Sequence, residues 1–168
     1  AKFFPGGKKK RKLRVEPSPL PEAWKETPRA GTRLTFEIEG VEFAFRYCPA
    51  GEFTMGSPAS EAGRRDVEAR RKVTLTRGFW TLETPITQGM FEAATGSNPS
   101  YFSPTGRGRG SVNGLETSNF PVESVGWNDC VAFVKSLNDG GYLQAGFEFR
   151  LPTETEWEYA ARAGAETS

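Results

Sequence analysis

Cysteine and glutamate side chains are the groups in this sequence that could carry redox or acid–base chemistry, because the chain contains no histidine. That composition excludes a Ser-His-Asp triad, a Cys-His pair and a histidine-ligated zinc or iron site built from these residues. The two cysteines, Cys48 and Cys130, lie in apolar stretches and cannot form a disulfide framework. We interpret both as small buried apolar residues rather than as nucleophiles or metal ligands.

Glu154 and Glu156 are the remaining candidate pair for acid–base work. They lie two residues apart at the start of a predicted helix, so their side chains point in different directions. Thr153 and Glu156 instead have the spacing of a capping box, in which each side chain accepts a hydrogen bond from a backbone amide. Residues 149–151 before them are strand-like, and Gly164 is placed to end the helix. The pattern predicts a structural role for Glu156.

Composition indicates one globular domain with its own core. The chain has 168 residues, of which 36% are hydrophobic and 26% charged. A net charge of +1 gives no general attraction to nucleic acid, and no apolar run is long enough to cross a bilayer. We therefore expect no nucleic-acid partner and no membrane span. The compartment stays undetermined, with a preference for the cytoplasm because no signal segment is visible.

Residues 1–33 have the composition of a basic, proline-rich arm that precedes a domain over 34–168. Its basic run is a candidate contact for an acidic partner surface and comprises Lys8, Lys9, Lys10, Arg11 and Lys12. A solvated tail and a nuclear-localisation patch are the alternative interpretations.

Alternating apolar residues predict a β-hairpin from Leu34 to Tyr47, with its turn at Glu39 and Gly40. Further elements are expected as strands over 52–55, 73–76 and 79–83, and as helices starting near Thr87, Trp127 and Thr153. Because the strands do not alternate with helices, these elements predict an irregular α+β domain rather than a parallel sheet.

Two segments between these elements have a specific interpretation. Residues 96–120 form a long irregular loop, whose glycine- and arginine-rich part at 106–110 lacks the frame of a phosphate cradle and is interpreted as a flexible turn. The helix near Trp127 is expected to bury one face, made of Cys130, Val131, Phe133, Val134 and Leu137.

Four blocks of this sequence resemble, in the right order, the formylglycine-generating-enzyme (sulfatase-modifying-factor) family. They are PAGEFTMGS at 49–57, the segment at 79–90, PVESVGWND at 121–129 and RLPTETEWEYAARAG at 150–164. Together they span residues 41–168. The resemblance implies a C-type-lectin-like fold, with long loops and two helices against a small twisted antiparallel sheet.

The resemblance also implies structural roles for the residues that carry its signature. These residues are Trp127, Asp129, Arg150, Pro152, Thr153, Glu156, Trp157 and Tyr159. The aromatic members, Trp127, Trp157 and Tyr159, are expected to be core anchors. Arg150 is expected to form a polar contact with Glu156 or Glu158 that ties the helix to the strand before it.

The same resemblance places the catalytic groups outside these residues. Family members that oxidise a substrate cysteine to formylglycine bind copper(I) through a cysteine pair located beyond the last block. Cys48 and Cys130 do not match that pair, since Cys130 takes the place of an alanine. We therefore expect no catalytic or metal-binding residue within 1–168, and the cofactors stay unknown. Copper and calcium are implied only if a C-terminal half carries the family's ligands.

Three functions follow from the resemblance. The preferred one is a scaffold that recognises a protein or peptide ligand, and the alternatives are a copper-dependent oxidase and a structural subunit completed by another chain. A C-type-lectin-like fold closes its sheet with strands from its C-terminal half. Residues 1–168 are therefore expected to be an incomplete domain, continued beyond Ser168 or completed by a partner chain.

Overall fold

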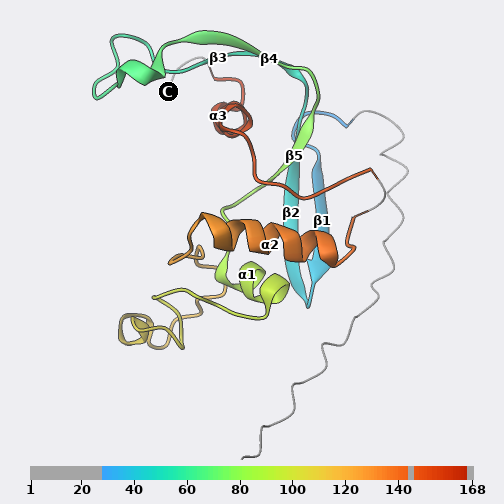
Figure 1. Ribbon diagram of the computed structural model, residues 1–168, viewed down its shortest axis with the longest axis vertical. Helices are drawn as coiled ribbons and strands as arrows, with labels where there is room; N and C mark the ends of the chain where they lie inside the picture. The colour runs from blue at the N-terminus through green and yellow to red at the C-terminus, as the bar shows by residue number, and fades with distance from the viewer. Residues whose placement is uncertain (1–27, 144–145, 166–168) are drawn as a thin grey trace, which may run out of the picture.

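The computed structural model describes residues 28–143 and 146–165 (Figure 1). The strands are β1 (Arg33–Ile38), β2 (Val41–Cys48), β3 (Gly51–Met55), β4 (Arg71–Leu75) and β5 (Phe79–Leu82). The α-helices are α1 (Gln88–Thr95), α2 (Trp127–Asp139) and α3 (Glu154–Arg162), and the single 3-10 turns are η2 (Asp66–Glu68) and η3 (Arg109–Val112). The predicted α+β class is confirmed. The basic run from Lys8 to Lys12 lies outside the described residues.

The strands form two small antiparallel sheets. One has the order β1–β2–β5, and the other pairs β3 with β4 in a hairpin that arches over α3 (Figure 1). The predicted hairpin is confirmed, because β1 and β2 pair directly across a turn at Glu39 and Gly40. Both turn residues have positive φ, 50° and 78°, as a two-residue turn matched to the twist of the strands requires.

All three helices begin where the sequence predicted. The structure therefore has one helix more than the two that the family resemblance implies. Thr87 caps α1 by accepting a hydrogen bond from the Met90 amide at 3.2 Å. Asp129 caps α2, where its carboxylate accepts from the Gly126 amide at 2.8 Å. α3 ends at Arg162, and its C-cap Ala163 is left-handed. Ala163 and Gly164 both have positive φ, so the predicted end at Gly164 is close to the observed one.

The core lies between one face of the three-stranded sheet and the helices α1 and α2, which cross that face (Figure 1). Its buried members are Ile38, Phe43, Met90, Phe91, Phe133 and Leu137. Phe91 and Phe133 stack with ring centroids 5.2 Å apart and thereby join the two helices. The core therefore fixes α2 relative to β2, and these two elements frame the site described below.

The predicted buried face of α2 is too wide. Phe133 and Leu137 are buried, Cys130 and Val134 are half-buried, and Val131 is 47% exposed. Phe133 and Leu137 are four residues apart and form a narrow stripe, and Val131 lies outside that stripe. Cys48 is also only half-buried, so neither cysteine is as fully buried as the sequence suggested.

The long loop after α1 is held by hydrogen bonds from the start of that helix. The buried Gln88 side chain donates to the Phe102 carbonyl at 3.0 Å and accepts from the Asn98 side chain at 3.0 Å. The stretch 106–110, interpreted as a flexible turn, packs closely against Tyr101 in its first part. Gly108 donates its amide to the Tyr101 carbonyl at 2.8 Å, and a side chain at Gly106 would collide with backbone oxygens.

Candidate functional site

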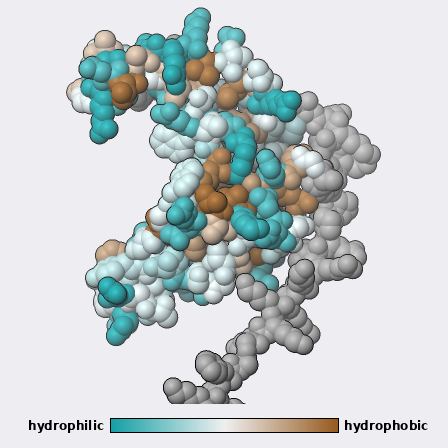
Figure 2. All heavy atoms as spheres, in the orientation of Figure 1, coloured by the Kyte–Doolittle hydropathy of each residue, from teal (hydrophilic) through white to brown (hydrophobic). Residues whose placement is uncertain are grey.

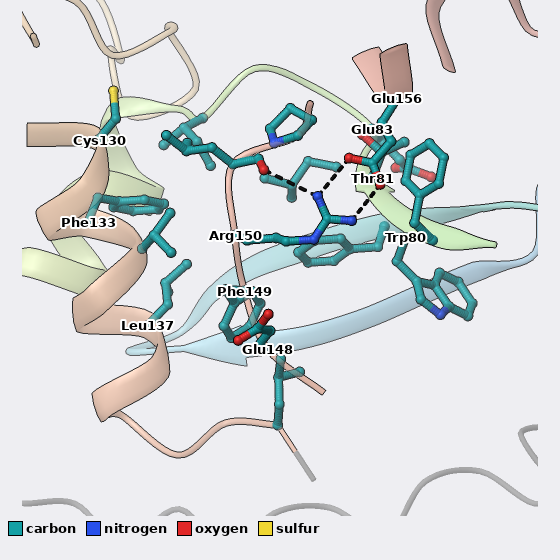
Figure 3. A pocket seen from close by; sticks show the side chains of 18 of the residues that line it. Trp80, Thr81, Glu83, Cys130, Phe133, Leu137, Glu148, Phe149, Arg150 and Glu156 are labelled. Carbon is teal, nitrogen blue, oxygen red and sulfur yellow. Dashed lines mark hydrogen bonds and ion pairs between the residues drawn. The ribbon is translucent and has the colours of Figure 1, made fainter. Parts of the chain in front are cut away.

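An apolar cleft of about 780 Å³ opens between β5, α2 and the chain that leads into α3 (Figure 3). The sheet contributes Phe45, and α2 contributes Phe133 and Leu137. Figure 2 shows hydrophobic side chains gathered near the middle of this face of the molecule. Clefts of this size and composition commonly bind ligands. The cleft is therefore the candidate functional site.

Residues 147–152 form one wall of this cleft, and they are not the strand that the sequence predicted at 149–151. An asparagine side chain takes the role of a neighbouring strand. The Asn138 carboxamide donates to the Phe149 carbonyl at 2.9 Å and accepts from the Phe149 amide at 2.8 Å. These two bonds satisfy the backbone of Phe149 as a strand pair would, so the wall is extended without belonging to a sheet.

Arg150 and Glu156 form an ion pair at the rim of the cleft (Figure 3). Arg150 Nη1 donates to Glu156 Oε2 at 2.7 Å, and the same carboxylate accepts from the Thr153 amide at 2.9 Å. The capping box is therefore present, and the expected polar contact of Arg150 goes to Glu156. The guanidinium, together with the Thr153 donors, lowers the pKa of Glu156 to about 2.

This lowered pKa predicts how the ion pair responds to acid. Folding moves the pKa of Glu156 from its ordinary value of 4.5 to about 2. The ionised carboxylate therefore stabilises the folded state above the ordinary value, and that contribution disappears as the pH falls through the folded pKa. We expect Glu156→Gln to be less stable than the wild type near neutral pH. The difference in free energy of unfolding should shrink between about pH 4.5 and 2.

Urea unfolding at several pH values measures this difference. Glu154→Gln is the matched control, because Glu154 is exposed in the same helical turn. This variant keeps the Arg150–Glu156 ion pair, so its stability near neutral pH should stay close to that of the wild type. A difference for Glu156→Gln that stays constant down to about pH 2 would contradict the assigned pKa.

A second polar cluster fixes α3 beneath the β3–β4 hairpin (Figure 1). Glu158 accepts hydrogen bonds from the Gly56 amide at 2.8 Å and from Arg162 Nε at 2.8 Å. Arg162 also donates to the Gly56 carbonyl at 2.9 Å. Tyr159 packs beside this cluster against Phe53, with ring centroids 5.2 Å apart. These contacts set the position of α3, and with it the rim that carries Glu156.

Two of the three aromatic residues expected as core anchors are on the surface. Trp127 is 72% exposed and Trp157 is 66% exposed, whereas Tyr159 is half-buried. The expectation is wrong for both tryptophans because no described element packs over them. Trp157 lines the cleft and Trp127 does not. An exposed tryptophan at the rim of an apolar cleft is a typical ligand contact.

The side chains that most often bind metals do not cluster among the described residues. No three histidine, cysteine, aspartate or glutamate side chains gather there at distances that would hold a metal ion. Cys48 lies on β2 and Cys130 on α2 at the cleft, and burial raises the pKa of the Cys48 thiol. A raised pKa disfavours the thiolate that copper(I) requires.

Residues 28–143 and 146–165 include no helix long and apolar enough to span a bilayer.

Sequence reasoning missed the cleft itself and the role of Asn138. An asparagine in the last turn of a helix indicates a helix end, but nothing in the sequence connects it to Phe149. The cleft walls come from β5, α2 and residues 147–152, which are distant in sequence.

Residues 44–168 match the family model described as "Sulfatase-modifying factor enzyme 1-like domain". Among curated proteins, the formylglycine-generating enzyme of Streptomyces coelicolor is 29% identical, over 69% of this chain and 46% of its own length. The formylglycine-generating enzyme of Mus musculus is 44% identical over 30% of this chain and 11% of its own length. The chain thus spans about half, or less, of the length of the curated relatives that it matches.

Two solved structures share the fold. Treponema denticola variable protein 1 matches with a TM-score of 0.62 and 25% identity, over 84% of this chain and 59% of that protein. PvdO from Pseudomonas aeruginosa matches with a TM-score of 0.63 and 26% identity, over 84% of this chain and 54% of that protein. Both therefore contain more chain than the part that matches.

Proposed function

Because the chain belongs to the sulfatase-modifying factor enzyme 1-like family, we propose that its domain is a recognition scaffold that binds a protein or peptide in the apolar cleft. The cleft carries this proposal. Its floor and walls are mostly apolar, and its rim holds the exposed indole of Trp157. A large aromatic group at a desolvated pocket usually contributes much of the binding energy at protein interfaces.

The rim adds a polar group that can orient a bound polypeptide. Arg150 is half exposed and shares its charge with Glu156, so it can still donate to a ligand carbonyl or carboxylate. An apolar centre with a polar rim is the usual anatomy of a polypeptide-binding site. These features support a ligand with apolar side chains and an accessible backbone.

Selection from a displayed library of random peptides tests this proposal. Selection on the immobilised chain should enrich specific peptides. The variant Trp157→Ala should bind these peptides about tenfold or more weakly. Trp127→Ala is the matched control, because Trp127 is equally exposed but lies outside the cleft. Enrichment that is unaffected by Trp157→Ala, or no enrichment at all, would refute the cleft as the recognition surface.

Oxidation of a substrate cysteine to formylglycine is the second candidate function, favoured by the names of the two curated relatives. It requires copper ligands that the described residues do not gather. A cysteine-containing peptide incubated with the chain, copper(I) and oxygen should therefore form no more aldehyde than a sample that lacks the chain. Mass spectrometric detection of an aldehyde on that peptide would replace the recognition function with the oxidase.

A further inference from the structure

A second hollow lies in the long loop between α1 and α2 (Figure 1). Its volume is about 360 Å³, at the lower end of the range for small-ligand sites. Its lining combines apolar and polar side chains, namely Pro104, Val112 and Leu115 with Arg109 and Asn113. No residue of this loop lines the apolar cleft. This loop hollow is therefore a separate candidate site.

Hydrogen bonds and burial hold the loop hollow in shape. The fully buried Ser103 side chain donates to the Ser100 carbonyl at 2.8 Å. The Leu115 amide donates to the Val112 carbonyl at 3.0 Å, and Val112 itself is buried. A site that is formed before its ligand arrives loses less conformational entropy on binding. The loop therefore offers a preformed surface to a small ligand.

Arg109 brings a positive charge to the loop hollow, and no described carboxylate forms an ion pair with it. Residues 93–115 contain no aspartate or glutamate. The next acidic residue along the chain, Glu116, accepts a hydrogen bond from the Ser118 amide at 3.1 Å. The Arg109 guanidinium is thus available to an anionic ligand.

The polar groups of the loop hollow favour a carboxylate among anions. A guanidinium presents two parallel N–H groups, which match the two oxygens of a carboxylate. Arg109 is the cation in this lining, which suits a single negative charge better than the near-double charge of a phosphate ester. The Asn113 carboxamide adds a further donor, and Val112 and Leu115 provide contacts for an apolar body.

We propose that the loop hollow binds a carboxylate, with Arg109 bonded to the carboxylate oxygens and the rest of the ligand packed on Val112 and Leu115. A small organic acid and the free C-terminus of a peptide share this chemistry. The inference goes beyond the proposed function, because it concerns a different surface and does not depend on the apolar cleft.

Hexanoate and benzoate are the probes that test this site, with hexanamide and benzamide as uncharged controls of the same shape. Nuclear magnetic resonance of the isotope-labelled full chain reports binding through the backbone amides of Gly110, Gly114 and Leu115, which line the hollow. We expect both acids to shift these amides with dissociation constants on the order of 1 mM, as is usual for ligands with so few atoms. The uncharged controls should bind about tenfold more weakly, because they lack the charge-assisted hydrogen bonds. Equal binding of acids and amides, or no shift with either acid, would overturn the inference.

Two arginine variants separate a built site from general attraction between charges. Arg109→Gln and Arg107→Gln remove the same charge from the same loop, but Arg107 does not line the hollow. We expect Arg109→Gln to weaken benzoate binding about tenfold or more, and Arg107→Gln to weaken it less than about twofold. Both side chains are exposed, so both variants should unfold at the same urea concentration as the wild type. Equal weakening by the two variants would overturn the site.

The acetylated tripeptide Ala-Val-Leu, as free acid and as C-terminal amide, separates the two sources of the carboxylate. Tighter binding of the tripeptide acid than of hexanoate, lost in Arg109→Gln, supports a peptide C-terminus, and weaker binding supports a small organic acid. Inorganic phosphate that binds more tightly than every carboxylate would overturn the assigned ligand class.

Trp157→Ala keeps this inference apart from the proposed function. Trp157 lines the apolar cleft and not the loop hollow, so this variant should bind benzoate like the wild type. A loss of benzoate binding in Trp157→Ala would place the acid in the cleft and overturn the inference. Failure of the loop hollow to bind carboxylates leaves the selection of peptides by the cleft unaffected, and the reverse also holds.

Discussion

Replacing Phe43 with alanine is expected to lower the free energy of unfolding by about 3–5 kcal/mol. Phe43 is fully buried, with 0% of its surface exposed, at the centre of the sheet face that α1 and α2 cover. Its ring stacks on Phe36 with centroids 5.4 Å apart, and Phe36 lines the cleft. The substitution therefore removes both core volume and the support of the cleft floor.

Urea unfolding measures this loss, and Phe43→Leu is the control. Leucine keeps an apolar side chain in the same place, so the control should cost less than about half as much. A loss below about 1 kcal/mol for Phe43→Ala would show that the core between the sheet and α2 is not packed as described, since fully buried phenylalanines rarely cost so little. Because small domains have only about 5–15 kcal/mol of stability, we expect Phe43→Ala to be close to unfolding.

Gly106→Ala is expected to destabilise the chain by about 1–3 kcal/mol through a steric collision with the backbone. A Cβ at this position would meet the carbonyl oxygens of Ser100 and Tyr101 inside van der Waals distance. Backbone oxygens cannot move aside like the end of a side chain, so the loop that follows α1 must shift. The Gln88 hydrogen bond to the Phe102 carbonyl lies in the same loop and should weaken with it.

Gly110→Ala is the matched control for this prediction. Gly110 lies in the same glycine- and arginine-rich stretch, a Cβ added there would have no neighbouring atom within 4 Å, and its φ is not positive. Alanine there should leave stability within about 1 kcal/mol of the wild type, or raise it slightly by restricting the unfolded chain. Equal unfolding midpoints for both variants would contradict the tight packing around Gly106.

Local patterns in the sequence predicted the elements well. The alternation from Leu34 to Tyr47 depends only on neighbouring residues, and so does the capping box of Thr153 and Glu156. Both are present in the structure, with β1 paired to β2 and the Glu156 carboxylate bonded to the Thr153 amide. The same local patterns predicted the α+β class, because the expected strands do not alternate with helices.

Features that depend on packing between distant segments were not predictable in this way. The family resemblance led us to expect Trp127 and Trp157 in the core. Burial depends on what covers a side chain, and no described element covers either tryptophan. Gly106 belongs to a stretch that looks flexible, yet its backbone fits against Tyr101. The cleft itself arises only when β5, α2 and residues 147–152 come together.

Membership of the family fixes the fold and leaves the function to the site, because one fold supports many activities. The site in this chain is an apolar cleft with an exposed indole at its rim, next to an ion pair that caps α3. In the proposed function, these groups would bind and orient a polypeptide. We therefore keep polypeptide recognition as the proposed function of this cleft.

Hydrogen exchange of the full chain, with and without a library-selected peptide, tests the cleft as the recognition surface most directly. We expect slower exchange on binding in β5 (Phe79–Leu82) and in residues 147–151, which line the cleft. Exchange in the exposed loop at 57–70, which is absent from the cleft lining, should stay unchanged. Protection confined to that loop, or no protection of β5 and residues 147–151, would rule out the cleft as the recognition surface.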